Sequence, residues 1–255
     1  MSDEATHRAQ IFLHRGDLAQ ARTCYEQAVE DDRRRQDDCA LSNSLGNLGN
    51  VCAMLGDLDT AERCYREVLA LQRSQPNLSA VGQTLVNLGN LHVEAGRPEQ
   101  ARPYYLEALD LLQPLRDHRA LGILYSNLAL QDAAQGHTDD AIDRFTQALG
   151  SHRIVGNEEG LAVTYSQLGK TFLQTGQLQQ AEKCFNNASE HFIKLGNEPG
   201  EAAVLRPLAD LYTQLGDTIS AVRCLERVVL VDSRYRLPEL RHDSEQLTRL
   251  RRHSQ

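Results

Sequence analysis

Cys52, His92 and Asp132 are the residue types of a nucleophile, a base and an acid that orients the base, and they follow one another at intervals of forty residues. Nucleophilic catalysis requires such groups within hydrogen-bonding reach of one another. The regular interval instead predicts that they hold one equivalent position in successive structural repeats, about 10 Å apart as packed helices are. We therefore interpret them as packing residues. The chain has no phosphate-binding glycine loop, His-Glu-x-x-His, Cys-x-x-Cys or Gly-x-Ser-x-Gly motif, so we expect no enzyme, no metal site and no cofactor.

Asparagine forms a second pattern, at positions that face away from the predicted core. Asn47, Asn87 and Asn127 are forty residues apart, and Asn50 and Asn90 repeat three positions later. Asparagine is a mediocre helix former because its side chain competes for backbone groups, yet these positions lie inside predicted helices. A carboxamide offers a donor and an acceptor, so a ladder of carboxamides can bind the backbone of an extended peptide. The alternative is that these amides satisfy buried groups within the fold.

The whole predicted binding surface lies on one side of the first helix of each repeat. It is polar in the second and third repeats, more apolar in the fourth, and mixed in charge in the fifth and sixth. The predicted peptide-binding residues are Asn43, Asn47, Asn50, Gln83, Asn87, Asn90, Glu94, Asn127, Leu130, Gln167, Lys170 and Arg206. A partner segment with polar backbone contacts near the asparagines and an apolar anchor near Leu130 would fit this surface.

The elements that position these side chains are marked by a glycine that recurs every forty residues. An alanine stands five residues after each glycine, and an aromatic residue or a leucine stands four residues after the alanine. The glycines are Gly16, Gly56, Gly96, Gly136, Gly176 and Gly216. A fixed period of this length predicts a solenoid, in which stacked helical units bury their apolar faces on their neighbours.

Each repeat is predicted to be a pair of antiparallel helices. The first helix begins after an Asp or Asn, whose side chain caps it, and runs to the glycine; the second begins there, with Asp17, Asp57 and Asp217 as caps and Pro98 in a first turn. The caps of the first helices are Asp37, Asn77, Asp117, Asn157 and Asn197. We assign the small residues next to Leu48 and its equivalents, the alanines and the aromatic column to the core.

This combination resembles the tetratricopeptide repeat: Leu-Gly or Leu-Ala, glycine seven positions later, alanine five later and an aromatic four later. Six copies cover almost the whole chain, and the first, with Arg8 and Ala9, is less complete. The forty-residue spacing is similar to the variant in kinesin light chains, spindle-orientation adaptors and bacterial peptide-pheromone receptors. The resemblance implies an all-α, right-handed superhelical solenoid whose first helices line a concave groove, with asparagines that clamp peptide backbones. The basic clamp of chaperone-binding relatives is not reproduced by Lys170 and Arg206 alone.

We expect residues 1–235 to form the repeat array and residues 236–255 to form a C-terminal capping helix with a basic tail. The repeat pattern decays after Leu225, and Leu247 and Leu250 belong to a narrow apolar stripe that can cover the end of the array. Residues 234–255 contain six arginines against three acidic residues, which favours a solvated terminal helix over a nucleic-acid-binding arm.

Composition narrows the choice of partners. The formal net charge is −8, which argues against general nucleic-acid binding, and no apolar run is long enough to cross a bilayer. The acidic first residues do not resemble a signal peptide, so we expect a cytoplasmic protein. Cys24, Cys64, Cys184 and Cys224 share one column, too far apart for disulfides, so we expect free thiols.

The sequence thus predicts a non-enzymatic protein–protein interaction scaffold that binds a peptide or partner segment in its concave groove. The alternative is an assembly chaperone or regulatory subunit that docks on a partner enzyme or regulatory domain. Weak self-association through the ends of the solenoid is also expected. No nucleic acid, membrane or cofactor is expected among the partners.

Overall fold

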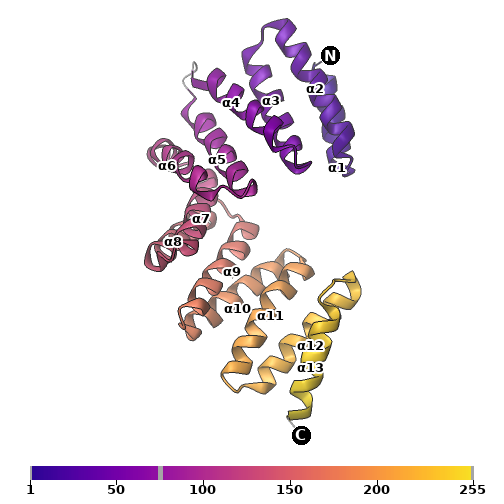
Figure 1. The fold of residues 1–255 in the computed structure, drawn as a ribbon, viewed down its shortest axis with the longest axis vertical. Coiled ribbons are helices and arrows are strands. Elements are labelled where there is room, and N and C mark those ends of the chain that lie inside the picture. The colour runs from indigo at the N-terminus through magenta and orange to yellow at the C-terminus, as the bar shows by residue number, and fades with distance from the viewer. Residues whose placement is uncertain (1, 74–76, 254–255) are drawn as a thin grey trace. The chain divides into compact units, whose positions relative to one another are not determined.

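The computed structural model describes residues 2–73 and 77–253, and every regular element within them is an α-helix. Successive helices form hairpins, and a thirteenth helix follows the sixth hairpin (Figure 1). The helices are α1 (Ser2–His14), α2 (Leu18–Arg35), α3 (Asp38–Met54), α4 (Leu58–Arg73), α5 (Leu78–Glu94), α6 (Pro98–Leu115), α7 (His118–Ala134), α8 (Thr138–Ile154), α9 (Glu158–Gln174), α10 (Leu178–Lys194), α11 (Glu198–Gln214), α12 (Thr218–Tyr235) and α13 (Leu240–His253). The predicted all-α repeat solenoid is confirmed.

The recurring glycines turn the chain between the two helices of each hairpin. All six have φ between 70° and 81°, a left-handed backbone conformation that residues with a Cβ seldom adopt. At Gly56, the amide donates to the carbonyl of Ala53 at 2.9 Å, and the next amide, of Asp57, donates to Cys52 at 2.9 Å. These two bonds satisfy carbonyls that the end of α3 leaves without helical partners. The need for positive φ explains why glycine is retained in every repeat.

Acidic and amide side chains begin the helices, as the sequence predicted. The side chain of Asn157 accepts the backbone N–H of Gly160 at 2.9 Å at the start of α9. The same contact is made at Asp37, Asn77, Asp117 and Asn197, and by Asp17, Asp57 and Asp217 at the second helices α2, α4 and α12. Pro98 is the first residue of α6.

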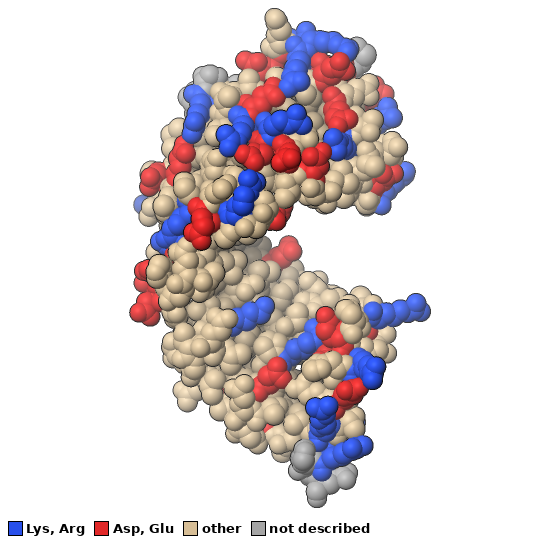
Figure 2. Space-filling view, in the orientation of Figure 1, with Lys and Arg blue, Asp and Glu red and all other residues tan. Residues whose placement is uncertain are grey.

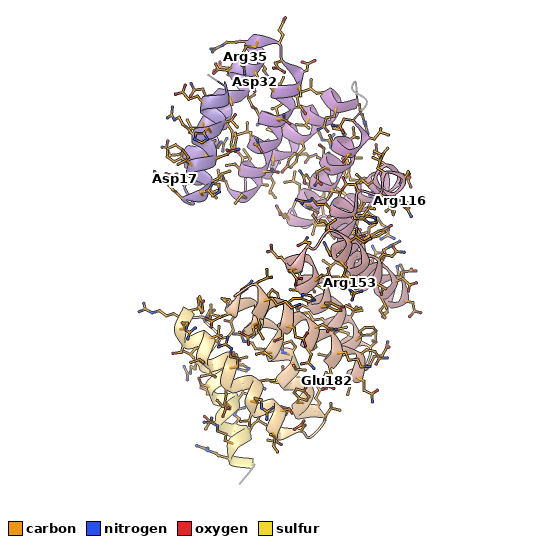
Figure 3. All side chains as sticks on the ribbon, turned by 180° about the vertical axis from the view of Figure 1, so that it is seen from behind. Asp17, Asp32, Arg35, Arg116, Arg153 and Glu182 are labelled. Atoms are coloured by element: carbon orange, nitrogen blue, oxygen red, sulfur yellow. The ribbon has the colours of Figure 1, made fainter. Side chains whose placement is uncertain are left out.

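The position before these caps also adopts a left-handed conformation, and here glycine is not always used. Gly156 and Gly196 have φ of 64° and 66°. Gln36, Arg116 and Arg236 occupy equivalent positions with φ of 53° to 54°, although each carries a full side chain. Figure 3 labels Arg116 at the turn that follows α6. The sequence pattern gave no sign of these three strained positions.

The chain divides into two compact units, Met1–Leu124 and Tyr125–Gln255, with the boundary inside α7. In the first unit, the rings of Tyr25, Tyr65 and Tyr105 are buried between hairpins. The ring of Tyr105 lies directly against Gly89, where an added Cβ would be 2.2 Å from Cε1 of the tyrosine. Glycine in α5 is therefore what allows the aromatic ring to pack.

The second unit uses the same arrangement with different wedge residues. Phe145, Phe185 and Leu225 are fully buried in place of the tyrosines. At the end of the unit, α13 packs on α12, and Leu247 joins a buried cluster with Ala209 and Leu225. Figure 2 shows basic side chains along the outer side of this last helix.

Candidate functional site

Six amide side chains lie together on the sides of α3 and α5 that face away from the core. Three belong to α3 and three to α5, and each is exposed or half-buried. They are Asn43, Asn47, Asn50, Gln83, Asn87 and Asn90. We call these six residues the asparagine surface; it lies wholly within the first unit. The expectation that they face away from the helix-packing core is met for this part of the chain.

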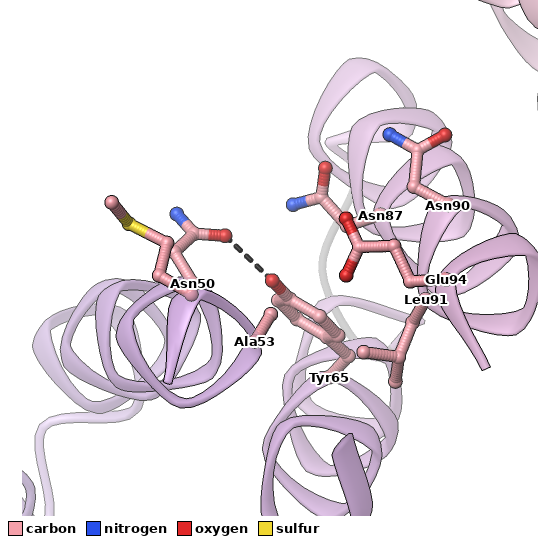
Figure 4. Close-up of a pocket in the computed structure, with 8 residues that line it drawn as sticks. Asn50, Ala53, Tyr65, Asn87, Asn90, Leu91 and Glu94 are labelled. Atoms are coloured by element: carbon pink, nitrogen blue, oxygen red, sulfur yellow. Dashed lines mark hydrogen bonds between the residues drawn. The ribbon is translucent and has the colours of Figure 1, made fainter. Parts of the chain in front are cut away.

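Two of these asparagines are oriented by tyrosines of the core. The hydroxyl of Tyr65, on α4, donates to Oδ1 of Asn50 at 2.7 Å, and the hydroxyl of Tyr105, on α6, donates to Oδ1 of Asn90 at 2.7 Å. The burial of its ring and the nearby Glu94 carboxylate raise the pKa of Tyr65, so its hydroxyl remains protonated and can donate. Each bond fixes the amide with its oxygen toward the tyrosine, as Figure 4 shows for Asn50 and Tyr65. The nitrogen of Asn50, a donor, is turned away from the tyrosine.

The other amides have few contacts within the protein. The side chain of Asn47 forms no hydrogen bond with any residue that the structure describes, and the side chain of Asn87 accepts one long bond, 3.3 Å, from Nε2 of Gln83. These side chains therefore contribute few hydrogen bonds to the fold. Their occurrence inside helices is not explained by internal hydrogen bonds.

A small pocket of about 250 Å³ opens between α3, α4 and α5 (Figure 4). Its polar lining comes from amide, phenol and carboxylate groups, and the remainder is aliphatic. The lining residues are Asn50, Ala53, Met54, Tyr65, Asn87, Asn90, Leu91 and Glu94. Four of the predicted binding residues, Asn50, Asn87, Asn90 and Glu94, thus line one pocket. We call it the Glu94 pocket.

Tyr65 is the residue that the sequence interpretation missed. The aromatic column was assigned to the core, and the ring of Tyr65 is indeed only 4% exposed. Its hydroxyl, however, reaches the pocket and holds Asn50. A signal was present in the sequence, because Asn50 and Asn90 each precede a tyrosine by fifteen residues. In later repeats both partners are replaced together: Leu130 precedes Phe145, and Lys170 precedes Phe185.

The predicted binding residues of the second unit differ from one another in chemical type and in exposure. Leu130 and Lys170 are exposed, and Asn127 and Gln167 are half-buried. Nearby, the hydroxyls of Ser126 and Thr164 lie 3.1 Å apart and join α7 to α9. Phe145, Phe185 and Leu225 have no hydroxyl, so these wedge residues cannot orient an amide of the first helices as Tyr65 and Tyr105 do.

Arg206 makes contacts other than those expected of a binding residue. Its guanidinium donates to Asp232 on α12 at 2.5 Å and to Asp243 on α13 at 2.7 Å, and both carboxylates are buried. The cation therefore joins α11 to the last two helices. We leave Arg206 out of the proposed binding surface because its Nε and Nη2 atoms are engaged by buried carboxylates within the fold.

Cys52, His92 and Asp132 have the separate surroundings expected of packing residues. His92 is 3% exposed and stacks on Tyr104 with ring centres 5.3 Å apart, whereas Asp132 pairs with Arg144 on α8. The six cysteines are free thiols. Across residues 2–73 and 77–253, no group of three His, Cys, Asp or Glu side chains is placed to hold a metal ion.

A repeat solenoid whose exposed first-helix side chains form a polar surface is an arrangement typical of protein-interaction scaffolds. The family model of the MalT-like TPR region matches residues 5–154, and a tetratricopeptide-repeat model matches residues 160–229. The chain belongs to the tetratricopeptide-repeat family. Repeats of this family generally act as non-enzymatic scaffolds that bind other proteins.

Solved structures resemble the chain in fold. BtubC from P. vanneervenii is 20% identical with a TM-score of 0.77, over 86% of this chain and 92% of that one. A signal transduction ATPase with numerous domains (STAND) from Pyrococcus horikoshii, which has a tetratricopeptide repeat sensor, is 15% identical with a TM-score of 0.82; the match covers 96% of this chain but 38% of that one. A Rap protein complexed with competence and sporulation factor is 14% identical with a TM-score of 0.68, over 93% and 66% of the two chains.

A comparison with curated proteins returned no match. No helix in the described part of the chain is both long and apolar enough to span a membrane.

Proposed function

We propose that the asparagine surface binds the backbone of an extended peptide segment of a partner protein, and that the chain acts as a non-enzymatic scaffold. The supporting observation is the pair of tyrosine–asparagine bonds, Tyr65–Asn50 and Tyr105–Asn90, which hold two surface amides in fixed orientations. A preoriented donor loses less side-chain entropy on binding than a mobile one. Peptide carbonyls are the natural acceptors for such donors, whatever the side chains of the segment.

The helix propensity of asparagine also supports the proposal. Alanine at a helix-interior position is more favourable than asparagine by up to about 0.7 kcal/mol. The chain has Asn47 and Asn87 in the middle of α3 and α5, where their side chains make at most one long hydrogen bond within the fold. Residues that reduce local stability without an internal contact are expected where a ligand uses them.

The remaining predicted residues outside the first unit, Asn127, Leu130, Gln167 and Lys170, are proposed as secondary contacts of the second unit. The apolar side chain of Leu130 is 42% exposed and would provide an anchor there.

A second candidate function is docking of the array on a regulatory or catalytic domain. The match to a STAND protein with a tetratricopeptide repeat sensor supports it, because the match covers only 38% of that chain, so a similar array there stands beside other parts of a longer protein. In that case the contacts would extend beyond the asparagine surface to the second helices.

The proposal can be tested with a random peptide library displayed on phage, from which peptides that bind the wild-type chain are selected. Binding of a selected peptide is then measured by fluorescence anisotropy for Asn47→Ala and Asn87→Ala. Losing one neutral hydrogen bond should weaken binding by about two- to tenfold for each variant. The melting temperature should stay the same or rise, since alanine favours the helix.

Asn187→Ala is the matched control, because Asn187 is a half-buried asparagine on the second helix α10. This variant should bind the peptide as the wild type does. Equal binding by Asn87→Ala and wild type would contradict the proposal, as would a fall in melting temperature that accounts for the lost binding. Binding lost on second-helix changes instead would favour the docking function.

A further inference from the structure

Glu94 stands out among the side chains on the exposed sides of α3 and α5. It is the charged residue among the eight that occupy these positions; the others are the six amides and Met54. The equivalent positions of the other repeats hold His14, Met54, Ala134, Gln174 and Gln214. The carboxylate at Glu94 is therefore particular to one repeat and is not part of the common pattern.

The carboxylate of Glu94 is not neutralised by the surrounding protein. No salt bridge with Glu94 occurs among residues 2–73 and 77–253. Arg66 on α4 and Arg97 at the start of α6 both pair with Glu62, at 2.8 and 3.7 Å. Elsewhere on the surface, acidic groups commonly have a cationic partner, as in the Arg33–Glu67 and Arg73–Glu107 pairs between second helices.

The carboxylate points into the pocket between α3 and α5, toward the side chains of Asn50 and Tyr65 (Figure 4). Its charge contributes to the raised pKa of Tyr65, which is consistent with their closeness. The other polar groups that line the pocket are a neutral phenol and three amides, so they add no positive charge that would compete with a ligand.

The walls beneath the carboxylate are apolar. Ala53, Met54, Leu91 and the ring of Tyr65 line them, and Met54 is 65% exposed. The volume, about 250 Å³, is below the range of about 300–1,000 Å³ for pockets that enclose drug-sized molecules, and suits one long side chain. Lysine and arginine have this combination, because their methylene stems lie along apolar surface while the charged end remains near polar groups.

We infer that the Glu94 pocket selects a lysine or arginine side chain on the bound peptide segment. The inference rests on the proposed function, because the asparagines hold the peptide backbone and the pocket receives one of its side chains. The stem contacts Met54, Leu91 and the face of Tyr65, and the cation pairs with Glu94. An acidic side chain is repelled there, and an apolar one covers the carboxylate without neutralising it.

The test uses the same phage-displayed peptide library, selected in parallel on the wild type, Glu94→Gln and Glu94→Lys. Peptides selected on the wild type should share a lysine or arginine at one position, and this preference should disappear with Glu94→Gln, which keeps the size of the side chain. Glu94→Lys should select an acidic residue at that position. Glu190→Gln is the control, since Glu190 is an exposed acid on α10.

A direct readout of the pocket is available from methionine labelling. The chain has two methionines, Met1 and Met54, so a 13C-methyl-methionine spectrum contains one signal from the pocket, which Met54→Leu assigns. A selected lysine peptide should shift this signal. The same peptide with norleucine in place of lysine keeps the stem but lacks the charge, and should bind at least about tenfold more weakly, the equivalent of about 1.4 kcal/mol.

The possible results separate the inference from the proposed function. Selected peptides that depend on Asn87 but show no basic preference, and bind Glu94→Gln as tightly as wild type, would overturn the inference and leave the proposed function in place. If no selected peptide depends on Asn87, both fail. Basic peptides that leave the Met54 signal unchanged would place the cation elsewhere and also overturn the inference.

Discussion

The substitution Gly89→Ala tests how closely the aromatic residues pack against the first helices. A Cβ at position 89 would lie 2.2 Å from Cε1, 2.6 Å from Cδ1 and 2.9 Å from Cζ of Tyr105. All three distances are shorter than any stable contact between carbon atoms, so the ring must move. Movement of the ring also displaces the hydroxyl that binds Asn90.

The size of the effect follows from three contributions. Overpacking of a core costs about 1–3 kcal/mol. Loss of the Tyr105–Asn90 hydrogen bond costs about 1 kcal/mol, and the helix gains about 1 kcal/mol when alanine replaces glycine. The last two offset each other, so Gly89→Ala should lower the free energy of unfolding by about 1–3 kcal/mol.

Gly46→Ala in α3 is the matched control. An added Cβ at position 46 has no heavy atom within 4 Å, so this variant should be stabilised by about 0.5–1 kcal/mol through helix propensity alone. Both variants are compared with the wild type by guanidinium denaturation followed by circular dichroism, using midpoints because repeat arrays do not always unfold in one step. If Gly89→Ala is as stable as Gly46→Ala, the argument for close aromatic packing is refuted.

Three further predictions concern other parts of the chain. Arg206→Met leaves the buried carboxylates of Asp232 and Asp243 without their cation and should lower the free energy of unfolding by about 3–5 kcal/mol. Amide hydrogen exchange in α13 should become faster; unchanged exchange there would contradict this prediction. Arg116→Gly removes a side chain from a residue with φ of 53° and should raise the denaturation midpoint by the equivalent of about 0.5–1 kcal/mol; a lower midpoint would mean that the side chain compensates for the strain. Burial lowers the pKa of His152, so the unfolded chain takes up a proton first as the pH falls, and the free energy of unfolding should decline below about pH 6.5. The variant His152→Gln should flatten this decline, which is measured as denaturation midpoints against pH.

The fold could be predicted from the sequence because the repeats supply the same local signals several times. Gly56 and its equivalents stand at the turns that their recurrence predicted, and Asn157 and its equivalents cap helices at the predicted residues. These features depend on interactions within a few residues of the chain. Such interactions are fixed by sequence alone.

The candidate site could be predicted only in part. The helical period places Asn50 and Asn90 on the exposed side, but it carries no information about a hydroxyl that arrives from another helix, as that of Tyr65 does. The same limit applies to Arg206, whose partners lie 26 and 37 residues further along the chain. Its position in a first helix suggested a binding residue, whereas the two buried carboxylates that engage it depend on tertiary packing.

The acidic side chain at position 94 has a consequence for how a bound segment is aligned. A ligand that contacted only repeated groups, such as Asn50 and Asn90, could slide by one repeat and recover similar contacts. A single carboxylate at a position where no other repeat has an acidic residue removes this ambiguity, because only one placement pairs a basic side chain with it. Exchanging the two residues, Met54→Glu together with Glu94→Met, should therefore shift the bound segment by one hairpin toward the amino terminus.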